Sequence, residues 1–447
     1  MTELETTDDK AVAPEFISFQ EACRYWFKLG WVSFGGPAGQ IAMMHLELVE
    51  KRRWLTQQSF LHALNYCMLL PGPEAQQLAT YIGWLMHGKL GGLVAGSLFV
   101  LPSFLILLSL GWIYLSFGQL GIMSGILYGI KPAVTAIVLA AAWRLSRKIL
   151  SNIGLWGMAI AAFLAIFVWH TPFPLIVLSA ALLGAGAGHF YPGKLNGGAT
   201  HQQKVLPIIT GQRQVPAHAI FRWRSFLGTI AVGLALWLAS MAGLYGLYGW
   251  DGALTQMAWF FTKAALLTFG GAYAVLPYVY QGVVEHYQWL TANQMMDALA
   301  LGETTPGPLV MVLTFVGCVA GWSQAVFGPE HLFLASAAAA ILVTYFTFLP
   351  SFVFILAGGP LVESSQGNLK FGAALTGISA AVCGVIVNLA VFFAVPVFWP
   401  GHIDVFALTL GAGALLALIR FQAGVIKVIL GCGLAGLGHW IAGAWLF

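Results

Sequence analysis

Long apolar segments, separated by short polar ones, follow one another along almost the whole chain. About 20 helical residues, rising 1.5 Å each, cross the roughly 30 Å hydrocarbon layer of a membrane. The clearest segments of this length are 90–117, 120–143, 149–169, 225–247, 331–356, 371–398 and 425–447. This pattern predicts an all-α polytopic membrane protein, with the lipid bilayer as its partner.

Composition agrees with lipid as the main solvent. Of the 447 residues, 59% are hydrophobic and 8% are charged, whereas a soluble protein carries about 25% charged residues. The net charge of +4 comes without a basic run, so nucleic acid is not expected as a partner. Residues 1–17 are polar and acidic, without a basic start and an apolar core, so no cleavable signal peptide is predicted.

The cysteines and histidines do not indicate a metal site. The five cysteines are scattered, and His45, His62 and His87 show no ligand spacing with carboxylates. We expect the cysteines to be small packing residues, and no metal or cofactor to be bound. The sequence also contains no Cys/His pair or carboxylate cluster with a catalytic arrangement, so an enzyme is not expected.

An internal duplication is the most informative feature of the sequence. Three motifs recur 235 residues later: Ser33-Phe34-Gly35-Gly36 as Thr268-Phe269-Gly270-Gly271, Trp54-Leu55-Thr56 as Trp289-Leu290-Thr291, and Pro71-Gly72-Pro73 as Pro306-Gly307-Pro308. A fourth motif recurs 248 residues later: Leu101-Pro102-Ser103-Phe104 as Leu349-Pro350-Ser351-Phe352. Four motifs in one order predict two homologous halves.

Charge predicts opposite orientations for the two halves. Sixteen of the 20 Lys and Arg residues lie at or before Arg224, and basic loops stay in the cytoplasm. The first-half loops should therefore face inward, and the crossing at 225–247 should invert the second half. The expected organisation is a polar cytoplasmic N-terminus (1–17), a first transporter repeat (18–190), a cytoplasmic linker (191–224) and a second repeat (225–447).

Each half contains two places where an apolar helix should break. The Gly-Gly motifs add flexibility, and the Pro-Gly-Pro motifs lie between segments too short to span, as in a hairpin that enters the membrane and returns. Broken backbone survives at that depth only where protein or a water-filled cavity satisfies it. A helix that restarts after such a break offers free N–H groups and its dipole to an anion. Ordinary kinks are the alternative reading.

Charged and polar residues beside these breaks are candidates for the pathway, because a charge is costly in lipid. Lys263 and Lys131 lie within apolar segments, and Lys28 is the equivalent of Lys263, although it can also extend its amine to the interface. Glu74 and Glu303 flank the two Pro-Gly-Pro motifs at positions that are not equivalent. Either could exchange a proton, and Glu74 could instead stabilise a helix N-terminus. The amides of Gln76 and Gln77 could donate to an oxyanion.

These motifs together resemble the chromate ion transporter family. The resemblance rests on Phe34-Gly35-Gly36-Pro37, Trp54-Leu55, Pro71-Gly72-Pro73-Glu74-Ala75-Gln76-Gln77-Leu78-Ala79 and Gly83, and on the second-half motifs given above. It covers nearly the whole chain, as in the long, two-domain members. It implies secondary transport of chromate out of the bacterial cytoplasm across the inner membrane, chromate resistance, competition with sulfate, and opposite orientations of the halves.

The sequence thus predicts alternating access around a site where inverted repeats meet. The expected substrate-binding residues are Lys28, Phe34, Gly35, Gly36, Pro71, Gly72, Pro73, Glu74, Gln76, Gln77, Lys131, Lys263, Phe269, Gly270, Gly271, Glu303, Pro306, Gly307 and Pro308. A sulfate or other oxyanion permease, an anion channel and an intramembrane enzyme are the alternatives. The coupling ion stays open, and a homodimer is compatible with the sequence.

Overall fold

The computed structural model describes residues 17–118, 120–190, 217–364 and 372–446. These residues form helices and no strand, which confirms the all-α prediction. Six of the described helices are long and apolar enough to cross a membrane, so the polytopic membrane class is confirmed as well. The predicted N-terminal segment 1–17 and linker 191–224 lie outside the described residues, apart from residue 17 and residues 217–224.

The first half begins with short helices and continues with long ones. Its elements are α1 (Phe19–Val32), α2 (Gly36–His45), a π-helical segment (Leu46–Lys51), α3 (Gln57–Cys67), α4 (Glu74–Phe117), α5 (Gly121–Ile149), α6 (Ile153–Phe167) and α7 (Phe173–Phe190). The backbone of α4 is not helical at His87 and Gly88. α4 therefore consists of a short section before this bend and a long section after it.

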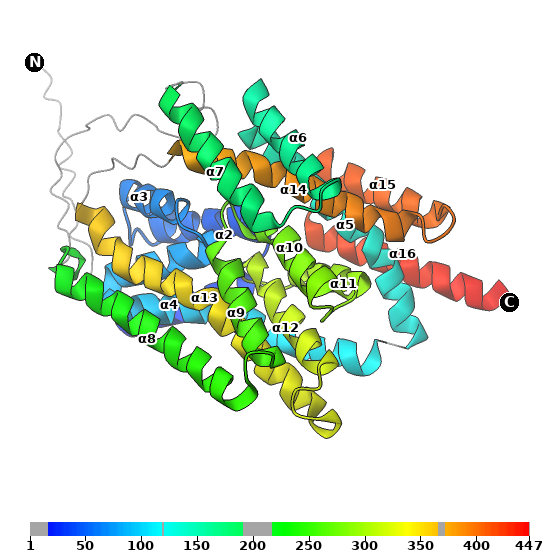
Figure 1. Cartoon of the computed structure of the whole chain (residues 1–447), viewed down its shortest axis with the longest axis horizontal. Coiled ribbons are helices and arrows are strands. Elements are labelled where there is room, and N and C mark those ends of the chain that lie inside the picture. Colours follow the sequence, from blue (N-terminus) through cyan, green and yellow to red (C-terminus); the bar gives the residue numbers. More distant parts are fainter. Residues whose placement is uncertain (1–16, 119, 191–216, 365–371, 447) are drawn as a thin grey trace, which may run out of the picture.

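The second half repeats this order. α8 (Trp223–Tyr248) joins the halves and runs along one outer edge of the molecule (Figure 1). The elements that follow are α9 (Ala253–Leu266), α10 (Ala272–Tyr280), a π-helical segment (Gln281–His286), α11 (Ala292–Thr304), α12 (Val312–Ser323), α13 (Leu332–Ser364), α14 (Gly372–Phe398), α15 (Val405–Ile419) and α16 (Val425–Leu446). Short 3-10 turns occupy Ala217–Ala219, Leu309–Met311 and Pro329–His331. The prediction of two repeats is confirmed.

Equivalent residues have the same local structure even where their side chains differ. Arg53 and Gln288, 235 residues apart, both have a positive φ, of 52° and 54°. Three residues further on, Thr56 and Thr291 each cap a helix, and each side chain accepts a backbone N–H at 3.2 Å. Such a cap stabilises the first turn of a helix. The duplication therefore extends from the motifs to the backbone between them.

The two halves run in opposite directions, as α4 and α13 show. These equivalent helices lie side by side (Figure 1). Gly92, near the start of the long section of α4, lies against Leu356 of α13, whereas Trp112, near its end, packs against Phe333 with 6.1 Å between ring centroids. The numbering rises along one helix as it falls along the other. Because equivalent helices are antiparallel, the repeats are inverted.

Each half also packs its last helix against the other half. A Cβ on Gly129 of α5 would lie 2.7 Å from the Cα of Gly436 of α16. The equivalent contact joins α14 of the second half to α7, the last helix of the first half. A Cβ on Gly377 of α14 would lie 2.9 Å from the Cα of Gly184 of α7. Small residues let membrane helices approach this closely. The two halves therefore form one interlocked body.

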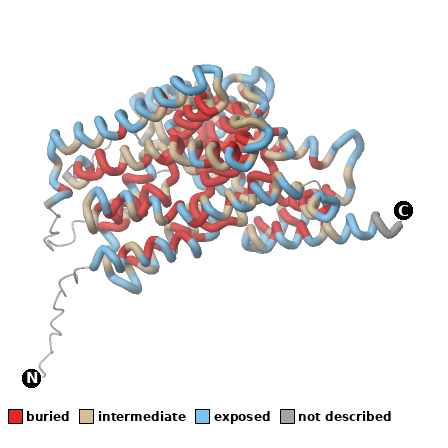
Figure 2. Tube along the Cα trace, turned by 90° about the horizontal axis from the view of Figure 1, so that it is seen from below, coloured by how far each residue is buried: buried red, intermediate tan, exposed pale blue. Residues whose placement is uncertain are grey.

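Buried residues concentrate where the helices cross, and the outer helices expose their outward faces (Figure 2). Large apolar side chains such as Leu227, Leu247 and Leu434 are exposed there, as expected where lipid is the solvent. All five cysteines are free, and four of them are buried. This placement agrees with their expected role in packing.

Candidate functional site

The Gly-Gly motifs break the helices where the sequence predicts. α1 ends at Val32 and α2 begins at Gly36, while α9 ends at Leu266 and α10 begins at Ala272. Gly35 and Gly36 have φ values of 95° and 70°, and Gly270 and Gly271 have values of 80° and 96°. Only glycine adopts this backbone region without strain, so the motif itself produces the break.

The Pro-Gly-Pro motifs form the tips of two hairpins. α3 enters the first tip and the short section of α4 leaves it, while α11 enters the second tip and α12 leaves it after a 3-10 turn. α3 has 11 residues and α11 has 13, which gives lengths of about 17 and 20 Å. These helices are too short to span, as the prediction of re-entrant hairpins requires.

Each hairpin tip crosses the broken helix of the other half. The backbone N–H of Gly72 donates to the carbonyl of Thr268 at 2.7 Å, and the N–H of Gly307 donates to the carbonyl of Ser33 at 2.9 Å. The two hydrogen bonds are equivalent under the 235-residue offset. We call them the Gly72 crossing and the Gly307 crossing. The structure thus brings all four predicted glycine motifs together in pairs.

The Leu-Pro-Ser-Phe motifs complete the crossings. A Cβ on Gly307 would lie 2.8 Å from the Cβ of Ser103. A Cβ on Gly72 would meet the Oγ of Ser351, the equivalent of Ser103. Both glycines are buried, and their φ values of 96° and 133° are positive. Each hairpin tip therefore needs glycine both for its backbone angle and for its close approach to the opposite half.

Two glutamines of the first half support the crossings. The Gln40 side chain donates its Nε2 hydrogens to the carbonyls of Ser33 and Gly307. Gln77 donates to the carbonyl of Pro71 at 2.7 Å and to the hydroxyl of Ser351 at 3.5 Å. The equivalent positions in the second half are Val275 and Val312, so this polar support comes from the first half.

Buried polar atoms without a partner gather around the two crossings. Five side chains that are completely buried each have one such atom in the described structure: Ser33 Oγ, Gln40 Oε1, Gln76 Oε1, Gln77 Oε1 and Ser103 Oγ. A buried polar group without a partner costs about 1–3 kcal/mol, and such groups normally find one. The cluster is therefore suited to a polar ligand or ordered water.

The two carboxylates beside the hairpins have different surroundings. Glu303 lies near the end of α11 and accepts a hydrogen bond from the Tyr273 hydroxyl of α10. Arg144 of α5 acts electrostatically on both groups. Glu74 is the first residue of α4 after its N-cap, Pro73. A carboxylate at that place stabilises the helix N-terminus, which favours the structural role for Glu74.

The three predicted lysines lie in different surroundings. Lys263 is half-buried, and its ammonium lies 5.6 Å from the centroid of the Trp259 ring. Lys131 is half-buried beside the helix proline Pro132, and Lys28 is exposed. Among the described residues, none of the three donates a hydrogen bond to a crossing residue. The predicted role of the lysines in the pathway stays a prediction.

The aromatic residues of the Gly-Gly motifs differ in burial. Phe34 is 38% exposed, and Phe269 is half-buried against the large central core.

Among the described residues, no group of three or more His, Cys, Asp or Glu side chains is placed to hold a metal ion.

The sequence pattern of a known family, the chromate transporters, matches residues 21–185 and 255–437. The chain belongs to the chromate transporter family. The two matched segments fall in the two halves, and the family is one of transporters. Together with the six spanning helices, membership identifies the chain as a multi-pass protein of the bacterial inner membrane.

Relatives of the same length accompany this match. The chain is 32% identical to a chromate transport protein of Pseudomonas aeruginosa, over 96% of this chain and 94% of the relative. It is 29% identical to a chromate transport protein of Cupriavidus metallidurans, over 86% of this chain and 84% of the relative. No solved structure matches the chain significantly.

The structure adds four residues to those that the sequence predicts for substrate binding. Gln40 and Tyr273 lie outside the repeated motifs, and Ser33 and Ser103 lie within them. A comparison of the halves at the 235-residue offset contains the signal for two of them, because Gln40 replaces a valine and Tyr273 replaces Ala38. Polar residues that only one repeat carries in an apolar helix mark where the transporter departs from symmetry.

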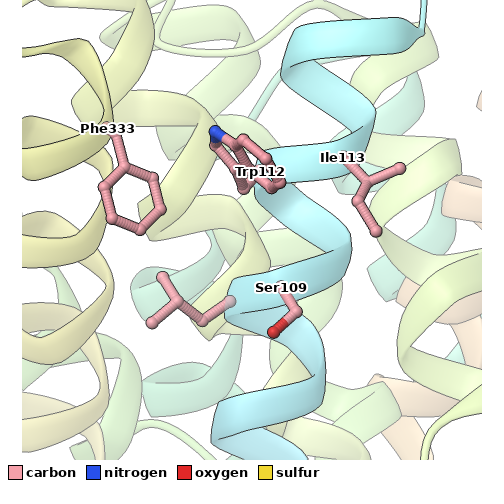
Figure 3. A pocket seen from close by; sticks show the side chains of 5 residues that line it. Ser109, Trp112, Ile113 and Phe333 are labelled. Carbon is pink, nitrogen blue, oxygen red and sulfur yellow. The ribbon is translucent and has the colours of Figure 1, made fainter.

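A surface hollow of about 420 Å³ lies between α4 and α13, away from the crossing residues (Figure 3). Trp112 and Phe333 face each other across it, and Ile113 points away. Ser109 also lines the hollow, and its hydroxyl donates to the carbonyl of Leu105 at 2.8 Å. Since Trp112 and Phe333 are 43% and 51% exposed, this apolar hollow suits contact with lipid rather than with an anion.

Proposed function

We propose that the chain is a secondary transporter that carries chromate across the bacterial inner membrane, through the region of the Gly72 and Gly307 crossings. The names of the relatives support chromate as the cargo. The buried hydroxyl groups of Ser33 and Ser103 beside the Gly307 crossing, which have no partner among the described residues, carry the assignment of the path. The pathway residues are those of the four glycine motifs together with Gln40, Gln76 and Gln77.

A tetrahedral oxyanion suits the groups at the crossings. The hydroxyl groups of Ser33 and Ser103, which have no partner in the described structure, can donate to its oxygens, as can the second Nε2 hydrogen of Gln76. The amides of Gln40 and Gln77 instead hold the backbone carbonyls of the crossings in place. Hydrogen bonds to a charged acceptor are roughly twice as strong as neutral ones. Sulfate has the same shape and charge as chromate, so we expect it to compete.

The inverted arrangement of the crossings suits alternating access. One hairpin tip closes on the other half at Gly72, and its equivalent closes at Gly307 in the opposite direction. One crossing can therefore open while the other stays closed, as in transporters built from inverted repeats. A channel, by contrast, would need both crossings open at once.

We propose outward transport. Moving negative charge out of a cell with an inside-negative potential gains about 2.3 kcal/mol per charge per 100 mV. A chromate dianion is thus driven outward by the membrane potential, and its removal from the cytoplasm would give resistance.

Chromate flux in proteoliposomes, under an imposed membrane potential and with sulfate as a competitor, tests this function. Saturable chromate movement that responds to the potential and is weakly inhibited by sulfate is the expected result. Sulfate movement without chromate movement would make the chain a sulfate permease. Flux that does not saturate and shows no counterflow would indicate a channel. A homodimer is compatible with the sequence, and native mass spectrometry of the same preparation tests for one.

A further inference from the structure

A second buried polar site lies in the second hairpin, on α11, the helix that leads into the Gly307 crossing. Asp297, in the middle of α11, is 3% exposed. Its Oδ2 accepts a hydrogen bond from the Tyr114 hydroxyl of α4 at 2.8 Å. Within the described residues, its Oδ1 is buried and has no hydrogen-bond partner. The motifs of the sequence do not include this residue.

Asp297 lies in a buried part of α11. Met295, Met296 and Ala298 of the same helix belong to the large apolar core. An ionised carboxylate in such surroundings is costly unless it is paired. One phenol donor satisfies one of the two oxygens, so the other oxygen is suited to carry a proton.

One cation acts on this carboxylate. Lys131 is half-buried on α5, which packs against α11, and its positive charge favours the ionised form of Asp297. Within the described part of the chain no direct ion pair joins the two side chains. Lys131 is therefore balanced by Asp297 at a distance, and its charge can still be shared with an arriving anion.

The other elements packed against α11 bring no further charge to Asp297. α12 and the 3-10 turn before it carry none. On α16, Lys427 borders a groove beside α15, and His439 stacks on Phe406 at 4.2 Å. On α11 itself, Glu303 is hydrogen-bonded to Tyr273. Arg144 of α5 donates to the carbonyl of Leu418, and the thiol of Cys318 on α12 is buried. Tyr114 and Lys131 are the titratable groups that act on Asp297.

We propose that Asp297 is the proton-binding residue of the transport cycle, and that the proton binds together with the anion. This inference rests on the proposed function, and a proton carried with the dianion leaves one net negative charge for the membrane potential to drive outward. When a dianion approaches Lys131, the ionised Asp297 repels it at low dielectric. Transfer of a proton from water to Oδ1 removes that repulsion and frees the charge of Lys131 for the anion. By linkage, the anion strengthens proton binding by the same factor.

Proton uptake on anion binding tests the proposal directly. Chromate is added to the purified protein in weakly buffered detergent solution, with a pH indicator, at about pH 7. The wild type should take up protons as it binds chromate. Asp297→Asn should bind chromate with little uptake, and its affinity should vary less with pH. Protonation of chromate itself contributes equally to both proteins, so the difference isolates Asp297.

Three further variants make the assignment specific. Glu285→Gln, which removes an exposed carboxylate of the same half, should behave as the wild type. Tyr114→Phe keeps the carboxylate and should move the midpoint of uptake to higher pH, which provides a readout if Asp297→Asn does not fold. His62, equivalent to Asp297 in the first hairpin, is replaced by Asn, and this variant should retain the uptake.

Two outcomes would overturn the proposal: undiminished proton uptake in Asp297→Asn, or loss of the uptake in His62→Asn instead. Failure of the wild type to bind chromate at all would contradict the proposed function rather than the role of Asp297. Chromate binding by the wild type without proton uptake would leave the proposed function standing and defeat the coupling.

Discussion

The backbone N–H of Gly72 donates to the carbonyl of Thr268 at 2.7 Å and so ties the first hairpin to the broken helix of the second half. The equivalent bond from Gly307 to Ser33 ties the second hairpin to the first half. Neither half can form these contacts alone. The region proposed for the anion is therefore built jointly by the two repeats.

Gly307→Ala should lower both stability and transport. An alanine held at this positive φ is strained by about 1–3 kcal/mol. In addition, its Cβ would lie 2.8 Å from the Cβ of Ser103. The double variant Gly307→Ala/Ser103→Gly should recover part of the melting temperature. Gly35→Ala, at φ 95° in open space, measures the backbone strain alone. Equal melting temperatures for Gly307→Ala and the double variant would show that the contact with Ser103 does not matter.

Lys263→Ala should reduce chromate flux more than Lys28→Ala does. The two lysines are equivalent in the repeats, but Lys263 is half-buried over Trp259 and Lys28 is exposed. A cation in a low-dielectric region interacts more strongly with an anion, so we expect a loss of about tenfold or more for Lys263→Ala. Flux is compared at matched expression. Equal flux in the two variants would remove Lys263 from the pathway.

Positions 51 and 286, which are equivalent in the repeats, should face opposite sides of the membrane. Inverted halves require this, and the basic residues beside Lys51 place it in the cytoplasm. Lys51→Cys and His286→Cys are each made in a Cys23→Ser background. This removes the one native cysteine that is not buried and could react with the label. A membrane-impermeant maleimide applied to intact spheroplasts should label position 286 alone. Labelling of both positions would refute the opposite orientations.

Gly129→Val should destabilise the protein through the packing of α5 on α16. Its Cβ would meet the backbone of Gly436, and overpacking costs about 1–3 kcal/mol. Gly157→Val, on α6 with no heavy atom nearby, is the matched control. The melting temperature in detergent should fall for Gly129→Val and stay unchanged for the control. Equal melting temperatures would mean that this interlocked contact does not contribute to stability.

Much of this architecture could be predicted from the sequence, because it follows from local rules. The paired glycines and the Pro-Gly-Pro motifs predict breaks in the helices, and a constant offset identifies equivalent residues. The offset could not show that Gly72 contacts Thr268 rather than Ser33, since equivalence says nothing about which half a hairpin meets. The segment 149–169 also differs from expectation. α5 extends to Ile149 and α6 has 15 residues, because Asn152 caps a new helix there.

The role of Gln40 depends on contacts across the halves, and no local pattern specifies them. Its side chain reaches Gly307, 267 residues away. Asp297 likewise accepts its hydrogen bond from Tyr114, which lies 183 residues earlier in the sequence. Long-range partners of this kind require the fold.

The kinetics of chromate flux in the variants Gln40→Val and Gln77→Val test the central claim most directly. Each variant installs the valine that the other half carries at the equivalent position, and Gln57→Val changes an exposed glutamine as a control. Each glutamine donates to carbonyl groups of the crossings. Its replacement leaves these carbonyls without that donor, at a cost of about 1–3 kcal/mol, so we expect KM for chromate to rise by about tenfold in each variant. An unchanged KM and maximal rate in the double variant, at wild-type expression, would contradict a chromate path through the two crossings.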